Sequence, residues 1–293
     1  MKKNIAYDSI PAPVTCKCKA EPLPHYFTFH SHNGFEILPF VSGNVSLYYE
    51  KDSIYMHPGD VIMVPPYVFH RGYQNDETPY VRDVLNIRED YTFIGREEDY
   101  RRLTQLFFKG DNQKIKVIRP DHDSFIQIHD LMKKIEKTLS EPIDFDSLLL
   151  RDSCIAQVLI LLYRAEKNHP NSGRVSDTWP ESMPAFIIET FQYIDNHLTE
   201  PVSLDAISEA VHINKYYLCR TFHEFTGGSI GQYIIEKRLS FARQKLKAGF
   251  KPYDACFQSG FNNYANFSRT FTRHVGVSPK AYQMARRMSG ENI

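Results

Sequence analysis

The hydrophobic pattern of residues 26–87 is typical of short β-strands. Runs rich in aromatic and β-branched residues stand at 26–29, 36–41, 45–50, 60–64 and 81–87. Turn-forming clusters separate them, among them Ser42-Gly43-Asn44, Lys51-Asp52-Ser53 and His57-Pro58-Gly59-Asp60. Closely spaced short strands of this kind predict a small barrel or jelly roll. Residues 1–24 contain several prolines and little periodicity, which indicates an irregular arm or an edge segment.

The pattern then changes to a helical period. Between Asp123 and Leu139 the apolar positions step by three and four residues, and Pro142 follows. Asp144 is a good cap for a second helix at about 147–167. The apolar residues of that helix lie on two sides, Leu148, Ile155, Leu159 and Leu162 on one and Leu149, Cys154, Val158 and Leu161 on the other. This wide apolar surface either packs against the barrel alone or, as we favour, also meets a partner.

Residues 169–183 have the composition of a linker. They contain Gly173, several prolines and polar residues, and they show no apolar period. We therefore expect one domain at 1–168 and another at 184–293, able to reorient when a ligand binds.

The second of these regions contains one pattern twice. Asp205-Ala206, Asn214, Arg220-Thr221-Phe222, Gly227 and Tyr233 recur, with the same residue types, 49 positions later at Asp254-Ala255, Asn263, Arg269-Thr270-Phe271, Gly276 and Tyr282. So many matches at one offset indicate an internal duplication.

Each copy predicts two short helices joined by a tight turn. In the first copy Ser203 caps a helix at 204–211, and Asn214 caps a second one that ends before Gly227. In the second copy Pro252 begins a helix, Gly260-Phe261 forms the turn, and Asn262 or Asn263 caps a helix that ends before Gly276. This arrangement is a tandem helix-turn-helix.

The second helix of each copy carries side chains that suit contact with DNA. In the first copy these are Asn214, Lys215, Tyr216, Cys219, Arg220 and His223, and in the second Asn263, Tyr264, Asn266, Arg269, Arg273 and His274. Arg and Asn read guanine and adenine edges, whereas Lys, Tyr and His add phosphate contacts. Arg220 and Arg269 are the strongest candidates for base contacts. A helical spacer at 231–247 could hold the two helices about one DNA turn apart, roughly 34 Å.

This region resembles the DNA-binding domain of AraC/XylS-type transcription regulators. The resemblance rests on Ala210, Leu218-Cys219-Arg220-Thr221-Phe222, Gly227, Tyr233 and Arg238-Leu239-Ser240-Phe241-Ala242, and on Gly260-Phe261, Asn263-Tyr264-Ala265-Asn266-Phe267, Gly276, Ser278-Pro279 and Tyr282. It implies seven helices and two recognition helices in successive major grooves of double-stranded DNA. It further implies contact with RNA polymerase, activation as the commoner mode, and a homodimer formed by the helical pair at 123–167.

A second constellation lies in the predicted barrel. His30-Ser31-His32, Glu36 and Gly43 resemble the first motif of cupins, and Gly59, Pro65 and His70 resemble the second. The second motif departs twice, with Tyr67 where cupins favour Gly and Gln74 where they favour Asn. In metal cupins the matching positions, His30, His32, Glu36 and His70, would hold a divalent transition metal such as iron, manganese, nickel or zinc.

The alternative, which we favour, is a metal-free effector pocket. Regulators of the resembled family commonly carry a cupin-like sensor domain. Its lining would be His30, His32, Glu36, Tyr48, Tyr67 and His70. Aromatic faces beside polar groups suit a hydroxyl-rich small molecule such as a sugar.

Charge and cysteine content fit this assignment. The chain has no formal net charge, but from Pro184 onward 13 Lys and Arg stand against 9 Asp and Glu, which leaves 22 against 26 before it. A basic C-terminal part suits nucleic acid. The odd count of five cysteines, with no apolar segment after Met1-Lys2-Lys3, predicts reduced thiols and a cytoplasmic protein that does not enter the membrane.

Two functions remain in competition. A metal-dependent cupin enzyme fused to a DNA-binding module needs an open metal position and turnover. A transcription regulator needs only a ligand-dependent change in DNA affinity. Because residues 184–293 take up over a third of the chain, we favour the regulator and assign no catalytic residue. The predicted fold is α+β in two domains, a cupin-like barrel with a helical pair followed by an all-α tandem helix-turn-helix domain.

Overall fold

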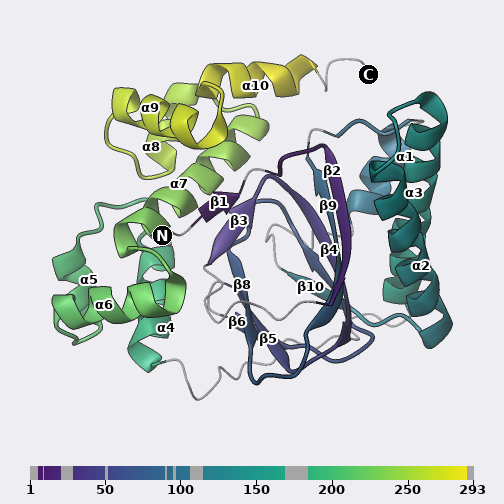
Figure 1. Ribbon diagram of the computed structural model, residues 1–293. Helices are drawn as coiled ribbons and strands as arrows, with labels where there is room; N and C mark the ends of the chain where they lie inside the picture. Colours follow the sequence, from purple (N-terminus) through teal and green to yellow (C-terminus); the bar gives the residue numbers. More distant parts are fainter. Residues whose placement is uncertain are drawn as a thin grey trace. The chain divides into compact units, whose positions relative to one another are not determined.

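The computed structural model describes residues 6–8, 10–20, 29–49, 52–89, 91–94, 97–105, 115–168 and 184–288. Contacts divide the chain into two compact units, one made of Asp8–Trp179 and the other of Pro180–Ile293 with Met1–Tyr7 (Figure 1). The predicted linker at 169–183 lies outside the described residues. Each unit is described by itself.

The first unit is built on two antiparallel sheets. One sheet has, within this unit, the order β3 (His30–His32), β8 (His70–Gln74), β5 (Val45–Tyr49) and β6 (Asp52–Tyr55), whereas the short strand β1 (Ala6–Asp8) falls mostly in the segment grouped with the other unit. The other has the order β10 (Lys116–Ile118), β7 (Val61–Val64), β4 (Gly34–Ser42), β9 (Val81–Arg88) and β2 (Val14–Ala20). The β-rich first domain expected from the hydrophobic pattern is therefore confirmed.

Four of the five predicted strand runs agree with the structure. The runs at 36–41, 45–50, 60–64 and 81–87 form β4, β5, β7 and β9, and the expected edge segment includes β2. The run at 26–29 falls almost entirely outside the described residues. The turn predicted at Lys51-Asp52-Ser53 is wrong from Asp52 onward. Asp52 and Ser53 belong to β6 because they pair with Tyr49 and Tyr48 of β5.

Alternation along β4 separates two cores. Leu38 and Phe40 pack between the sheets with Leu47 and Val64, all of them buried. Ile37 points the other way, into a second cluster that includes residues of two helices. Because strand side chains repeat every two residues, Glu36 shares the inward face of β4 with Leu38 and Phe40. A carboxylate thus stands beside an apolar interior.

Two long helices cover the outer face of the β4 sheet (Figure 1). They are α2 (His122–Leu139) and α3 (Phe145–Asn168), and the buried residues that join them to the sheet include Ile128, Met132, Ile155 and Leu159. Asp144 accepts a hydrogen bond from the Ser147 backbone nitrogen at 2.7 Å, as expected of a cap.

The buried carboxylate of Asp152 fastens a neighbouring loop to α3. It accepts hydrogen bonds from the Tyr91 hydroxyl at 2.5 Å and from the Ile94 backbone nitrogen at 2.6 Å. Tyr100, in α1 (Glu97–Thr104), also approaches the Asp152 backbone oxygen. One side chain therefore links the segment 91–94 to α3.

The second unit contains seven described helices. They are α4 (Ala185–Asn196), α5 (Leu204–Ala210), α6 (Lys215–Thr226), α7 (Ile230–Lys247), α8 (Pro252–Gln258), α9 (Tyr264–Val275) and α10 (Pro279–Met288). The helices α6 and α9 begin and end 49 residues apart, as do the starts of α7 and α10. Asn214 and Asn263 cap α6 and α9, and Gly227 and Gly276 end them in the left-handed conformation. The duplication read from the sequence is thus a duplication of structure.

Gly260, in the turn of the second motif, lies close to the backbone that follows α4. Gly260 has a φ of +86°, and a Cβ there would lie 2.4 Å from the Leu198 carbonyl oxygen and 2.8 Å from Arg238 Nε. Arg238, in α7, donates from Nε to the same Leu198 oxygen at 2.9 Å. The turn of the second motif, the spacer helix and the end of α4 therefore meet at one point.

Candidate DNA-recognition surface and effector site

The predicted DNA-contacting side chains of the first motif lie mostly on the open face of α6. Tyr216 is 80% exposed and the Arg220 side chain 69%. Asn214 and His223 are also exposed, whereas Cys219 is half-buried. Their spacing of three and four residues puts Tyr216, Cys219, Arg220 and His223 on one side of the helix.

Two acidic residues, Asp205 and Glu224, affect which charges the first motif can offer to DNA. Lys215 is half-buried, and its Nζ lies 2.7 Å from Asp205 Oδ1 of α5. The acidic residue Glu224, which the sequence analysis did not select, stands exposed one turn after Arg220. The 49-residue offset pairs Glu224 with Arg273, and this difference in charge is the sequence signal that could have revealed it.

The second motif presents a comparable face on α9. Asn263, Asn266, Arg269 and Arg273 are exposed, and Tyr264 is half-buried. His274 departs from the predicted surface. Its Nδ1 lies 2.5 Å from Oε1 of the buried Glu236 in α7, and its side chain is only 28% exposed. His274 packs against the spacer helix because it follows the helix face that carries the core residues Phe267 and Phe271.

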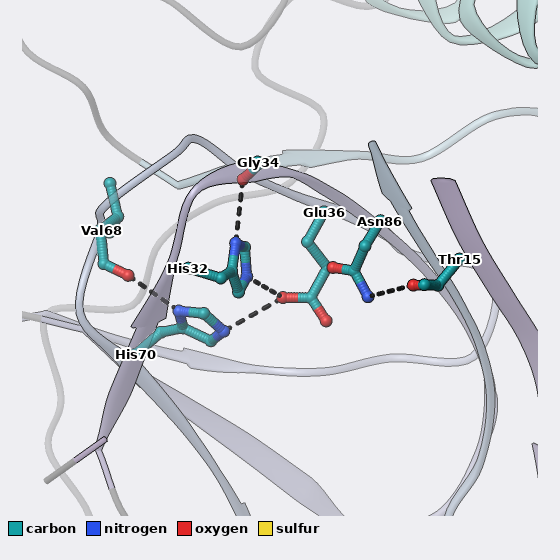
Figure 2. Close-up of polar contacts among 7 residues, drawn as sticks. All are labelled: Thr15, His32, Gly34, Glu36, Val68, His70 and Asn86. Carbon is teal, nitrogen blue, oxygen red and sulfur yellow. Dashed lines mark hydrogen bonds and ion pairs between the residues drawn. The ribbon is translucent and has the colours of Figure 1, made fainter. Parts of the chain in front are cut away.

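In the first unit, three of the predicted site residues converge inside the barrel. Nε2 of His32 and Nε2 of His70 each lie 3.1 Å from Oε2 of Glu36. Figure 2 shows both rings directed at this oxygen. All three residues are buried. The cluster joins β3, β4 and β8, and so it connects the two sheets.

The second ring nitrogen of each histidine is fixed by the backbone. His32 Nδ1 lies 2.9 Å from the Gly34 carbonyl oxygen, and His70 Nδ1 lies 2.9 Å from the Val68 carbonyl oxygen (Figure 2). A carbonyl oxygen only accepts hydrogen bonds, so each Nδ1 carries a proton. Both Nε2 atoms therefore face the carboxylate. They can donate N–H hydrogen bonds to it, or they can direct their lone pairs at a cation that the carboxylate also binds.

Glu36 is held as an anion by these neighbours. Burial by itself would raise its pKa, but hydrogen bonds from His32 and His70 outweigh burial and keep the pKa of Glu36 well below its usual range. The site thus combines one carboxylate with two imidazoles in a place closed to bulk water.

A divalent transition metal fits this donor set. One ligand atom from each of His32, Glu36 and His70 lies within 4.8 Å of the other two. Two imidazoles and a carboxylate suit such ions, and the carbonyl-anchored Nδ1 atoms are the outer contacts that orient metal-binding histidines. His30, the fourth predicted ligand, is not in this group. Its ring centre lies 4.3 Å from that of His70 but 6.1 Å from that of His32.

The two predicted tyrosines, Tyr48 and Tyr67, differ in their position relative to the cluster. His70 pairs with Tyr49 across β8 and β5, so Tyr48 pairs with Arg71 and points to the opposite face of the sheet. Tyr67 lies next to the cluster through its backbone, since its nitrogen donates to the His32 oxygen at 2.8 Å. Its hydroxyl donates instead to Glu89. Tyr67 has a φ of 66°, which explains why glycine is favoured at this position of the motif.

Asn86 extends the polar end of the barrel. It faces Glu36 across β9 and β4, and its Nδ2 lies 3.4 Å from Thr15 Oγ1 (Figure 2). Its Oδ1 is buried and accepts no hydrogen bond within the described part of the chain. Buried acceptors without a partner are unfavourable, so this oxygen is suited to a ligand that brings an O–H or N–H group.

Comparison with known proteins agrees with both units. Residues 207–285 match a family model described as a helix-turn-helix domain, and residues 18–107 match one described as an AraC-like ligand binding domain. The chain is 31% identical to the regulatory protein SoxS of Salmonella typhimurium over 99 residues, which cover 33% of this chain and 92% of SoxS. It is 35% identical to the multiple antibiotic resistance protein MarA of Escherichia coli over 101 residues, or 34% of this chain and 79% of MarA.

A match to a solved structure spans both units. ToxT from Vibrio cholerae shows 15% identity and a TM-score of 0.35, with 93% of this chain and 96% of that chain covered.

The chain is accordingly a DNA-binding transcription regulator with a ligand-binding domain. It belongs to the AraC family, which consists of regulators rather than enzymes. Among the described helices, none combines the length and the apolar composition that crossing a membrane requires.

Proposed function

We propose that this regulator activates transcription when a hydroxyl-rich small molecule, such as a sugar, binds at the His32–Glu36–His70 cluster. The observation that carries the proposal is the placement of this buried polar cluster beside an otherwise apolar interior. A carboxylate, two imidazoles and the Asn86 oxygen supply acceptors and donors that hydroxyl groups can satisfy. The matched effector-binding role of the first domain supports it.

A second candidate at the same cluster is a divalent transition metal. It is favoured by the convergence of both Nε2 atoms on one carboxylate oxygen. An ion held there would supply a Lewis-acidic centre for an effector's oxygen atoms. His32, Glu36 and His70 would hold it, and the Gly34 and Val68 carbonyls would keep the rings oriented.

Calorimetric titration of the full-length protein with monosaccharides and disaccharides tests the effector. We expect at least one sugar to bind more tightly than millimolar, and Glu36→Leu to abolish that binding while circular dichroism remains unchanged. His57→Ala, which changes an exposed histidine outside the barrel interior, is the matched control and should bind normally. Running the titration with chelator-treated and with Zn²⁺-loaded protein separates direct binding from metal-assisted binding. Absence of binding in both forms would reject the sugar proposal.

We also propose that residues 1–168 dimerise through α3, that 169–183 act as a linker, and that 184–293 bind operator half-sites and contact RNA polymerase. Several apolar residues of α3 are exposed, among them Leu149, Leu150, Ile160 and Tyr163. Leu161, which the sequence pattern assigned to a second apolar side, instead packs partly buried against the barrel core. An apolar helix face of this kind suits contact with the same face of a second copy.

Ile160→Glu should convert the dimer to a monomer. Ile160 is 37% exposed in the middle of α3, and a carboxylate there would be buried opposite its own copy in a two-fold interface. Analytical ultracentrifugation should show a dimer dissociation constant at least a hundredfold higher than that of the wild type, which corresponds to about 3 kcal/mol of lost association free energy. Val277→Glu, at a 44% exposed site in the helical unit, is the control and should remain dimeric. A dimer that survives Ile160→Glu would place the interface elsewhere.

A further inference from the structure

The two recognition helices carry opposite charges at one equivalent position. The offset of 49 residues places Arg220 on Arg269 and Glu224 on Arg273. In both helices the two positions are exposed and one turn apart. Because α6 and α9 have the same length and the same caps, these side chains occupy matching places on matching surfaces.

In the first motif both lysine and arginine residues of α6 have acidic neighbours. Arg220 Nε lies 3.6 Å from Glu224 Oε1, and its guanidinium stands 5.5 Å from the centre of the Tyr217 ring. Lys215 is paired with Asp205. The Arg220 side chain therefore has a carboxylate on one side and an aromatic ring on the other.

The second motif has no such restraint. Its recognition helix contains Arg269 and Arg273 and no acidic residue. Arg269 Nε approaches the carbonyl oxygen of Ala265 in its own helix at 3.4 Å, and among the described side chains of residues 184–284 neither arginine has an acidic partner. Both charges remain available for phosphate groups.

We propose that Glu224 makes the first motif the selective reader of DNA, while the second motif supplies most of the electrostatic attachment. Glu224 is 60% exposed at the edge of the recognition face, where a carboxylate would meet phosphate oxygens and be repelled. That repulsion is offset only when Arg220, which lies beside Glu224, contacts its correct base. Non-cognate sequences are then rejected by the first motif even though the second motif still binds them.

Fluorescence anisotropy of the full-length protein tests this division, with a mixed-sequence DNA duplex and with duplexes enriched by the wild-type protein from a random pool. Glu224→Gln should raise affinity for the mixed-sequence duplex about threefold or more, and should reduce the ratio of enriched to mixed binding. Arg273→Gln should weaken binding to both duplexes alike and lower the salt slope by about 1, leaving the ratio unchanged.

Glu209→Gln is the control, because Glu209 is an exposed acid at the end of α5, outside the recognition helix. An equal gain in Glu209→Gln would show that net charge alone is responsible and would overturn the proposal. An unchanged ratio of enriched to mixed binding in Glu224→Gln would overturn it as well. The proposal is supported if only Glu224→Gln both gains affinity for the mixed-sequence duplex and loses selectivity for the enriched duplexes.

Discussion

Gly260→Ala is expected to destabilise the helical unit by about 3 kcal/mol or more. Two costs add at this residue. The left-handed backbone, with φ of +86°, costs an L-residue about 1–2 kcal/mol. A new Cβ would also lie 2.4 Å from the Leu198 carbonyl oxygen and 3.0 Å from Thr199 Cα, both backbone atoms that cannot turn aside. The end of α4 must therefore move away, and the hydrogen bond from Arg238 to Leu198 is weakened.

Gly249→Ala separates the two costs. Gly249 has nearly the same φ, +87°, but an added Cβ there has no neighbour within 4 Å. It should lose only the backbone term of about 1–2 kcal/mol. Urea unfolding followed by circular dichroism at 222 nm would measure both variants. Equal midpoints for the two would mean that the close approach at Gly260 does not contribute to stability.

Asp152→Ala is expected to destabilise the barrel unit by about 3 kcal/mol. The change leaves the partly buried Ile94 backbone nitrogen and Tyr91 hydroxyl without their acceptor, and each unsatisfied donor costs about 1–3 kcal/mol. The segment 91–94 would then separate from α3. Hydrogen exchange should increase in residues 91–94 and in the adjoining part of α3.

The matched substitution is Asp130→Ala on α2. Asp130 is also an aspartate within a long helix, but it is exposed, and among the described residues its ion-pair partner is Lys133 at 3.4 Å. Its loss should change stability by less than about 0.5 kcal/mol. If Asp152→Ala were as mild as this control, the hydrogen bonds around Asp152 would not be what holds the loop.

The helical unit could be predicted closely from the sequence because its signals are local. Ser203, Asn214 and Asn263 cap the helices that they were expected to cap, and Gly227 ends α6. A cap depends on three or four neighbouring residues, all of which are visible in the sequence. The helix α4 was implied only by the family resemblance, since no cap side chain marks its start at Pro184.

The effector site was predicted only in part because it depends on pairing between distant strands. The spacing of His32 and Glu36 could be read along the chain, and His70 was placed with them by its motif. Whether Tyr48 faces the same side depends on the register of β5 against β8, which no local pattern reveals. The contributions of Asn86 and of the Val68 carbonyl are hidden for the same reason.

The length of the helix α7 sets the distance between the two motifs. Its 18 residues begin directly after the first motif and end directly before the second. Inserting one residue would rotate the second motif by about 100° and advance it by about 1.5 Å. Inserting seven would nearly restore the angle but add about 10 Å, the length of roughly three base pairs. With α6 and α9 as the proposed recognition helices, evolution can alter which bases are read by changing their side chains, whereas the distance between those bases is inherited with the length of α7.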